Sequence, residues 1–137
     1  MRKLTSLREH LDRVRRRRPE SVDAFVADVD RQDATAMSLL VAIQEAVDLA
    51  LHVASDEGWG VPASYAEGFE ILAHHGVIDA ELSSALGRIA GLRNRLARGY
   101  ASVDPARLWA EIPAGLDQLE RYSVAIARLV DDAAGRD

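Results

Sequence analysis

RQDATAMSLLVAIQEAVDLALHVAS, residues 31–55, is the longest segment of this 137-residue chain with unbroken helical periodicity. Its apolar side chains recur every three or four positions, which is the spacing of one face of an α-helix. They are Ala36, Leu39, Leu40, Ile43, Val47, Ala50, Leu51 and Ala54. A helix with such a long apolar face is typical of the centre of a helical protein. We therefore expect the other elements to pack around it.

Further amphipathic helices are predicted on both sides of this segment, and each has a start or stop signal. In chain order these signals are Pro19, Ser64, Gly76, Asp79, and Asp104 followed by Pro105. Serine and aspartate cap helix N-termini, proline suits the first helical position, and glycine ends helices. Pro113 lies within the apolar pattern of the last helix, and we expect it to kink or divide that helix.

The composition favours an all-α protein. Hydrophobic residues make up 48% of the chain and charged residues 28%, with alanine, leucine, arginine and acidic residues dominating over β-branched and aromatic types. The length suits one domain, residues 1–137. The prediction is an up-and-down bundle of four to five main helices. Because cysteine is absent, disulfides and thiolate zinc sites are excluded.

Charge and hydropathy limit the partners that the chain is expected to bind. The net charge of -5 argues against non-specific coating of nucleic acid. No uninterrupted apolar run approaches the roughly 18 residues of a membrane span. Arg2, Lys3, Arg8 and Glu9 break up the region where a signal peptide would have its apolar core. We expect a cytoplasmic protein that binds no membrane.

Four consecutive arginines, Arg15–Arg18, end the first predicted helix. Two interpretations are open. The run could be a solvated helix C-terminus, where cations interact favourably with the helix dipole, or it could contact RNA phosphates.

A polar stripe borders the apolar face of the central helix. It consists of Gln44, Asp48 and His52, each four residues from the next, so their side chains share one helix flank. They could form a catalytic acid–base array, or they could hydrogen-bond to neighbouring helices or a subunit interface. His74 and His75 suit the end of a helix, and no carboxylate is spaced to complete a metal site with them.

The most unusual segment is GLRNRLARGY, residues 91–100. Arg93 and Asn94 follow an apolar face through Leu82, Leu86 and Ile89, at positions where the helical period would place more core. The group therefore lies near the junction of two helices. Without further information, Arg93 could simply pair with an acidic neighbour, and the later side chains of the segment could be solvated or packed at the junction.

Several separated segments resemble one known family. In chain order they are residues 31–34 (RQDA), 42–50 (AIQEAVDLA), 62–67 (PASYAE) and 91–96 (GLRNRL). Together they are similar to the HepT-like branch of the HEPN superfamily, over about Leu7 to Leu129. The resemblance implies an all-α homodimeric toxin that cleaves RNA without a metal or cofactor. It also implies an MNT-type nucleotidyltransferase as the antitoxin partner.

The family signature is Arg-Asn, a few residues, His, one residue, Tyr. Arg93, Asn94 and Tyr100 match it, and Arg98 stands at the histidine position. The resemblance implies that Arg93 and Arg98 bind phosphate, that Asn94 contacts substrate or orients Arg93, and that Tyr100 is the residue to which the partner attaches nucleotide.

Arg98 changes the expected chemistry, because a guanidinium cannot exchange its proton near neutral pH and so cannot replace a histidine base. Three interpretations remain. The chain is a weak ribonuclease, or it is a non-catalytic module that binds the nucleotidyltransferase and RNA, or Asp48 or His52 supplies the proton transfer.

Overall fold

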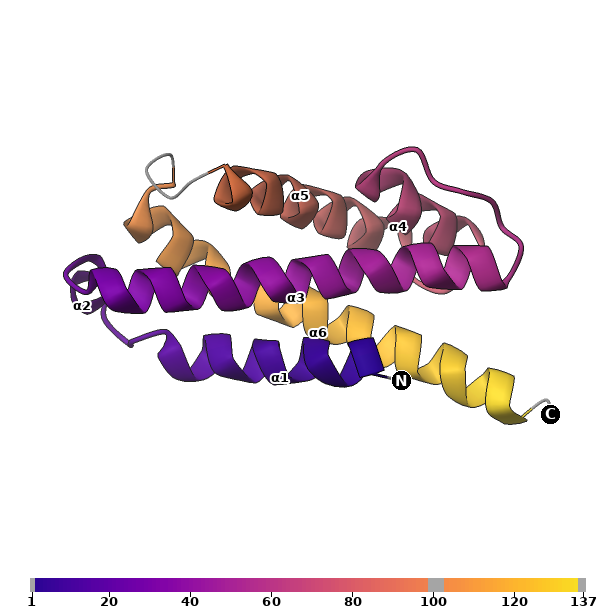
Figure 1. The fold of residues 1–137 in the computed structure, drawn as a ribbon, viewed down its shortest axis with the longest axis horizontal. Coiled ribbons are helices and arrows are strands. Elements are labelled where there is room, and N and C mark those ends of the chain that lie inside the picture. Colours follow the sequence, from indigo (N-terminus) through magenta and orange to yellow (C-terminus); the bar gives the residue numbers. More distant parts are fainter. Residues whose placement is uncertain (1, 99–102, 136–137) are drawn as a thin grey trace.

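The structure, a computed structural model, describes residues 2–98 and 103–135 of the chain. Within these ranges it is helical throughout its regular elements (Figure 1). The elements are α1 (Arg2–Arg17), α2 (Val22–Val26), α3 (Val29–Asp56), α4 (Tyr65–His74), α5 (Ala80–Ala97) and α6 (Pro105–Gly135). Four of these helices are long, and α2 and α4 are shorter connecting elements. The predicted all-α bundle is confirmed.

The helix predicted from residues 31–55 is α3, and it contacts every other helix of the described chain. Its neighbours α1 and α5 run opposite to it, whereas α6 runs in its own direction (Figure 1). By length and composition α3 could also cross a membrane, but over half of its most apolar window is buried inside the bundle. Such burial is what a core helix shows.

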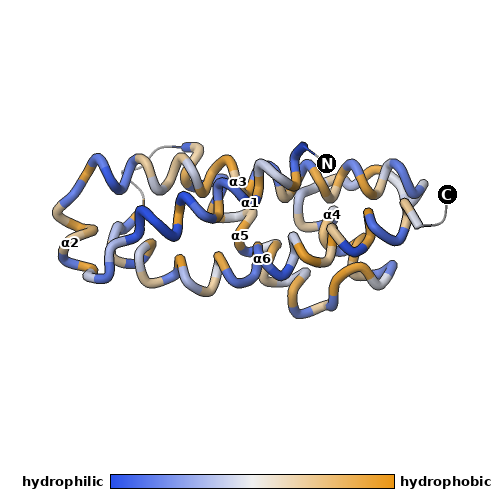
Figure 2. The backbone as a smooth tube through the Cα atoms, turned by 90° about the horizontal axis from the view of Figure 1, so that it is seen from below, coloured by the Kyte–Doolittle hydropathy of each residue, from blue (hydrophilic) through white to orange (hydrophobic). Residues whose placement is uncertain are grey.

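The core is built from one face of each long helix. Along all of them hydrophobic and hydrophilic positions alternate (Figure 2), as amphipathic packing requires. The largest fully buried side chains are Tyr122, Phe25, Phe69, Leu7, Leu11, Ile43, Leu49, Leu72, Leu86, Leu119, Ile126 and Val14. They come from all six helices, so the bundle has one shared core.

The helix boundaries follow the cap residues of the sequence. Ser64 Oγ accepts a hydrogen bond of 3.1 Å from the Glu67 N–H, and Asp79 Oδ1 accepts one of 2.7 Å from the Leu82 N–H. Gly76 follows α4 with φ of 78°. A residue in this left-handed region ends a helix, and glycine adopts the region without steric cost. These local signals are therefore sufficient to place the ends of α4 and the start of α5.

The expectation that Pro113 could divide the last helix is wrong, because α6 is continuous through it. Proline has no N–H, so the carbonyl four residues earlier, that of Trp109, loses its helical partner. Arg18 Nε donates to this carbonyl at 3.0 Å. The Arg18 guanidinium also lies 3.9 Å from the centre of the Trp109 ring, and Trp109 Nε1 donates to the Pro19 carbonyl at 2.7 Å. Arg18, the residue directly after α1, thus supplies the hydrogen-bond donor that Pro113 lacks.

Arg17 and Arg18 of the arginine run are half-buried and packed against other elements, so its interpretation as a solvated helix end is wrong for these two, whereas Arg15 and Arg16 are exposed. Arg18 is bound to Trp109, as described above. Arg17 donates to the Ala34 carbonyl and to Ser38 Oγ of α3, and Arg15 pairs with Asp12 and Glu120. These contacts join the end of α1 to α3 and α6. Contact with RNA stays a prediction.

Candidate functional site

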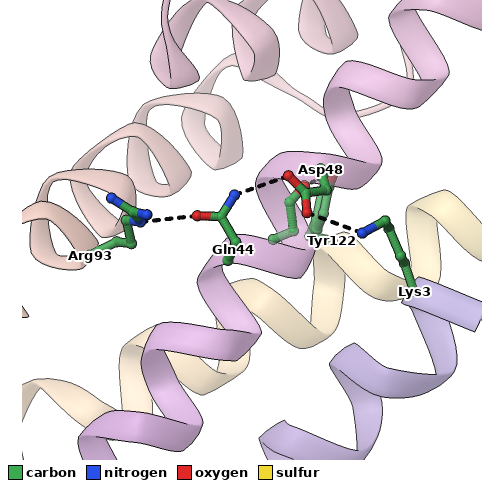
Figure 3. A network of polar contacts seen from close by, with 6 residues as sticks. Lys3, Gln44, Asp48, Arg93 and Tyr122 are labelled. Carbon is green, nitrogen blue, oxygen red and sulfur yellow. Dashed lines mark hydrogen bonds and ion pairs between the residues drawn. The ribbon is translucent and has the colours of Figure 1, made fainter. Parts of the chain in front are cut away.

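Arg93 and Asn94 lie in the last two turns of α5, and Arg93 points toward α3 (Figure 3). Arg93 Nε donates a hydrogen bond of 3.1 Å to Gln44 Oε1. Its Nη1 donates one of 3.3 Å to Asn94 Oδ1. The guanidinium is therefore held by two neutral amide oxygens, one from α3 and one from the next residue of its own helix.

Gln44 is itself held by the next residue of the polar stripe. Its Nε2 donates to Asp48 Oδ1 at 2.9 Å, and Asp48 Oδ2 accepts from Lys3 Nζ at 3.1 Å. Lys3 belongs to the first turn of α1, so the chain of contacts spans α1, α3 and α5 (Figure 3). The two groups of residues singled out in the sequence, the stripe and the Arg-Asn pair, meet in one network.

Arg93 has no carboxylate partner among the residues that the structure describes, so the idea that it pairs with an acidic neighbour is not supported. By contrast, Arg107 on α6 pairs with Glu111 at 3.0 Å. The ring of Tyr65, at the start of α4, lies 5.7 Å from the Arg93 guanidinium carbon, within cation–π range. Arg93 is thus half-buried and oriented, while its charge stays uncompensated by direct contact.

His52, the third residue of the stripe, does not join this network. Its Nε2 lies 3.1 Å from Asp56 Oδ2, one turn further along α3. His74 and His75 end α4, and the His75 ring stacks on Trp59 at 4.0 Å. Within residues 2–98 and 103–135, no group of three or more histidine, aspartate or glutamate side chains is arranged to hold a metal ion.

Arg98 is the C-terminal cap residue of α5, and its side chain is exposed. Its backbone N–H donates to the Asn94 carbonyl at 3.3 Å. The structure does not bring its side chain into the Arg93 network. Tyr100, the expected modification residue, lies outside the described residues.

Two residues of the site, Tyr65 and Lys3, were not predicted from the sequence. Tyr65 stands in the segment that resembles the family, but no local signal connects it to Arg93. Lys3 is separated from Asp48 by 45 positions, and a single exposed lysine carries no pattern. Both could be found only from the way the helices pack.

The chemistry that this site supports is anion binding. A guanidinium with oriented N–H groups binds the oxygens of a phosphate or carboxylate well, because its fork matches their geometry. Gln44 and Asn94 occupy Nε and one N–H of Nη1. Nη2 and the other N–H of Nη1 have no hydrogen-bond partner among the described residues.

Comparison with known proteins identifies the family. A sequence model described as ribonuclease HepT-like matches residues 7–126. The chain is 27% identical over 120 residues to the tRNA nuclease HepT of Aphanizomenon flos-aquae, covering 88% of this chain and 82% of that protein. It is 29% identical over 80 residues to the mRNA nuclease HepT of Shewanella oneidensis, covering 58% of this chain and 60% of that protein.

Solved structures show the same fold at low sequence identity. A tri-AMPylated HEPN toxin of Shewanella oneidensis in complex with an MNT antitoxin matches with a TM-score of 0.85 and 22% identity, over 93% of this chain and 95% of that chain. A mutant of the MntA–HpeT toxin–antitoxin pair matches with a TM-score of 0.83 and 21% identity, over 93% and 96%. The bundle is a HEPN-type fold, and the chain belongs to the ribonuclease HepT-like family.

Proposed function

We propose that this chain is a HEPN toxin that cleaves RNA without a metal ion, with Arg93 as the residue that binds the scissile phosphate. The observation that carries the proposal is how the Arg93 side chain is held. Its guanidinium is oriented by two amide oxygens and has no carboxylate in direct contact among the described residues. An oriented cation of this kind stabilises the charge that develops on a phosphate during cleavage.

The remaining roles follow from the residue types. Cleavage by the ribose 2′-hydroxyl needs a proton acceptor for that hydroxyl and a proton donor for the leaving oxygen. Arg98 can add positive charge, but it cannot exchange a proton near neutral pH. We therefore propose weak activity, with Arg93 and Arg98 binding phosphate and Asn94 orienting Arg93 through its 3.3 Å hydrogen bond. The names of two relatives as tRNA and mRNA nucleases support RNA as the substrate class.

The test is cleavage of bulk bacterial tRNA by the purified protein in the presence of EDTA. We expect slow cleavage that falls about 10²- to 10³-fold in Arg93→Ala, the loss typical of one transition-state donor. Arg121→Ala is the matched control, because Arg121 is exposed on α6 beside Asp79, and it should cleave like the unsubstituted chain. Equal activity of Arg93→Ala and the control would refute the proposal.

The residue at position 98 provides a second test. Arg98→His restores a side chain that titrates near neutral pH. If only proton transfer is deficient, cleavage should increase by about 10²- to 10⁴-fold. Arg98→Lys is the control, since it keeps the charge without supplying a base, and it should not increase cleavage.

A non-catalytic interaction module is the second candidate, and it is favoured by the same arginine at position 98. In that case the protein binds an MNT-type nucleotidyltransferase without cutting RNA, as a homodimer. No cleavage by the unsubstituted chain or by Arg98→His, together with a complex in sedimentation, would favour this candidate.

For both candidates we propose that the partner transfers a nucleotide to Tyr100. The Shewanella toxin in complex with an MNT antitoxin is AMPylated, which supports this type of modification. Mass spectrometry of protein produced with and without the partner should find added AMP only with the partner. Tyr100→Phe should abolish the addition, and addition that persists in this variant would contradict the assignment.

A further inference from the structure

Four side chains from three helices form one continuous chain of hydrogen bonds that ends on Asp48 from both sides. Arg93 of α5 donates to Gln44 of α3, and Gln44 donates to Asp48 one turn further along the same helix. Lys3 of α1 donates to the other oxygen of Asp48. Figure 3 shows that Gln44 and Asp48 bridge the space between Arg93 on one side and Lys3 on the other.

The two flanking groups leave only one possible orientation for the Gln44 amide. An arginine can only donate, and an ionised aspartate can only accept. The amide oxygen must therefore face Arg93 and the amide nitrogen must face Asp48, as the distances of 3.1 and 2.9 Å show. The negative charge of Asp48 also polarises the amide, which strengthens its oxygen as an acceptor for Arg93.

A neutral residue between Arg93 and Asp48 has an electrostatic consequence. Lys3 pairs directly with Asp48 at 3.1 Å, and their charges cancel. Arg93 is held through a neutral amide and keeps its full charge, so the network as a whole carries one net positive charge. A glutamate in place of Gln44 would hold Arg93 as well but would neutralise it.

We propose that Gln44, oriented by Asp48 and Lys3, is a positioning residue that holds Arg93 by its Nε and directs the Nη groups at an RNA phosphate. This proposal rests on the proposed ribonuclease function and adds to it the role of the polar stripe. Asp48 acts through Gln44 and takes no part in proton transfer.

The first experiment is a double-mutant cycle for cleavage of bulk bacterial tRNA. Gln44→Ala should lower kcat about 10- to 100-fold, the value of a hydrogen bond to a charged group, with little change in KM. In an Arg93→Ala background the same substitution should have no further effect. The control is Met37→Gln, two turns before Gln44 on the same flank of α3, which should cleave normally because Met37 is exposed and lies outside the network. Independent, additive losses from Gln44→Ala and Arg93→Ala overturn the proposal.

The second experiment uses Gln44→Glu and pH. The charged groups facing this position are Asp48 on α3, Arg93 on α5 and Lys3 on α1. When protonated, the introduced carboxyl mimics the amide, because its carbonyl accepts from Arg93 and its hydroxyl donates to Asp48. When ionised, it neutralises Arg93 and repels Asp48. The ratio of mutant to unsubstituted activity should therefore rise as the pH falls, and a ratio independent of pH contradicts the proposal.

A spectroscopic measurement separates this inference from the ribonuclease proposal. The Nε–H signal of Arg93, assigned by its loss in Arg93→Lys, should shift in Gln44→Ala and stay in place in Met37→Gln. A signal unchanged in Gln44→Ala overturns the positioning role even if RNA is cleaved. If the signal shifts but a fluorescein-labelled RNA oligonucleotide is neither bound nor cleaved, the ribonuclease proposal fails and Gln44 orients Arg93 without acting on RNA, which also overturns the functional part of the inference.

Discussion

The Tyr122 hydroxyl is buried in the centre of the bundle and donates a hydrogen bond of 2.7 Å to the Ala46 carbonyl of α3. Its ring meets that of Phe69 edge to face, with ring centres 5.6 Å apart. Burial raises the pKa of the Tyr122 hydroxyl well above its ordinary value, because the ionised form would lose its hydration. The residue therefore belongs to the core and is unsuited to proton transfer.

Tyr122 should make the free energy of unfolding depend on alkaline pH. In the unfolded chain its hydroxyl ionises near pH 10, whereas the folded state holds the proton to higher pH. Its contribution is thus fully present below about pH 10 and is lost as the pH rises further. Tyr122→Phe should cost about 1 kcal/mol at neutral pH and should weaken the alkaline loss, measured by urea unfolding. Tyr65→Phe is the control, and an unchanged alkaline slope in Tyr122→Phe would contradict the assignment.

Thr35, unlike Tyr122, has a buried hydroxyl that is not hydrogen-bonded to any residue within 2–98 and 103–135. The residue is fully buried in α3. Burying an unsatisfied hydroxyl costs free energy, so the isosteric Thr35→Val should stabilise the protein by about 1 kcal/mol in urea unfolding. Thr35→Ala, which leaves a cavity, should not share this gain. A loss of stability in Thr35→Val would indicate that the hydroxyl has a partner in solution.

Among the helices, α6 depends for its continuity on Arg18, the residue directly after α1. Pro113 leaves the Trp109 carbonyl without a helical donor, and Arg18 provides one at 3.0 Å while stacking on the same tryptophan. An arginine is suited to this position because its planar group can donate and stack together. This interaction explains why a proline in the middle of a long helix does not end it.

Arg18 and Pro113 should therefore be energetically coupled. Arg18→Ala should lower the free energy of unfolding by about 1–3 kcal/mol, from a lost hydrogen bond to a charged group and a lost cation–π contact. In Pro113→Ala the helical N–H is restored, so the same Arg18 substitution should cost less. A double-mutant cycle by urea unfolding measures the difference. Arg16→Ala is the control at an exposed position of the same run, and equal costs in both backgrounds would exclude the coupling.

The whole bundle shares one core, because α3 contacts each of the other five described helices. The start of α6 and the C-terminus of α3 lie at opposite ends of the bundle (Figure 1), and a tryptophan lies in or next to each of these segments. Trp109 packs where α1 ends and α6 begins, and Trp59 follows the C-terminus of α3 and stacks on His75. If α3 unfolds, every other described helix loses part of the surface against which it packs.

Unfolding should consequently be a single transition. Trp59→Phe and Trp109→Phe each leave one fluorescent reporter, and in each variant fluorescence and circular dichroism should give the same urea midpoint. Ile43→Ala, in the centre of α3, should shift both reporters equally and cost about 2–5 kcal/mol. Different midpoints for the two ends would show that the bundle unfolds in parts.

Much of this fold could be predicted because its signals are local. The helical period of α3 and the caps at Ser64 and Asp79 act between residues less than two turns apart, so a single sequence displays them directly. That Pro113 does not divide the last helix could not be predicted in this way. Its effect on α6 depends on Arg18, and the Arg18 side chain and the Trp109 carbonyl are 91 positions apart.

In the candidate site, too, the residues could be predicted from local patterns, whereas their contacts could not. The residue pattern was enough to single out Arg93, Asn94 and the stripe of Gln44, Asp48 and His52, because each group is compact along the chain. That Gln44 binds Arg93, 49 positions away, that Lys3 closes the network and that His52 stays outside it depend on how α1, α3 and α5 pack. Local periodicity fixes which face of a helix is polar, but the partner of that face is set by the core, which brings distant segments together to bury apolar surface.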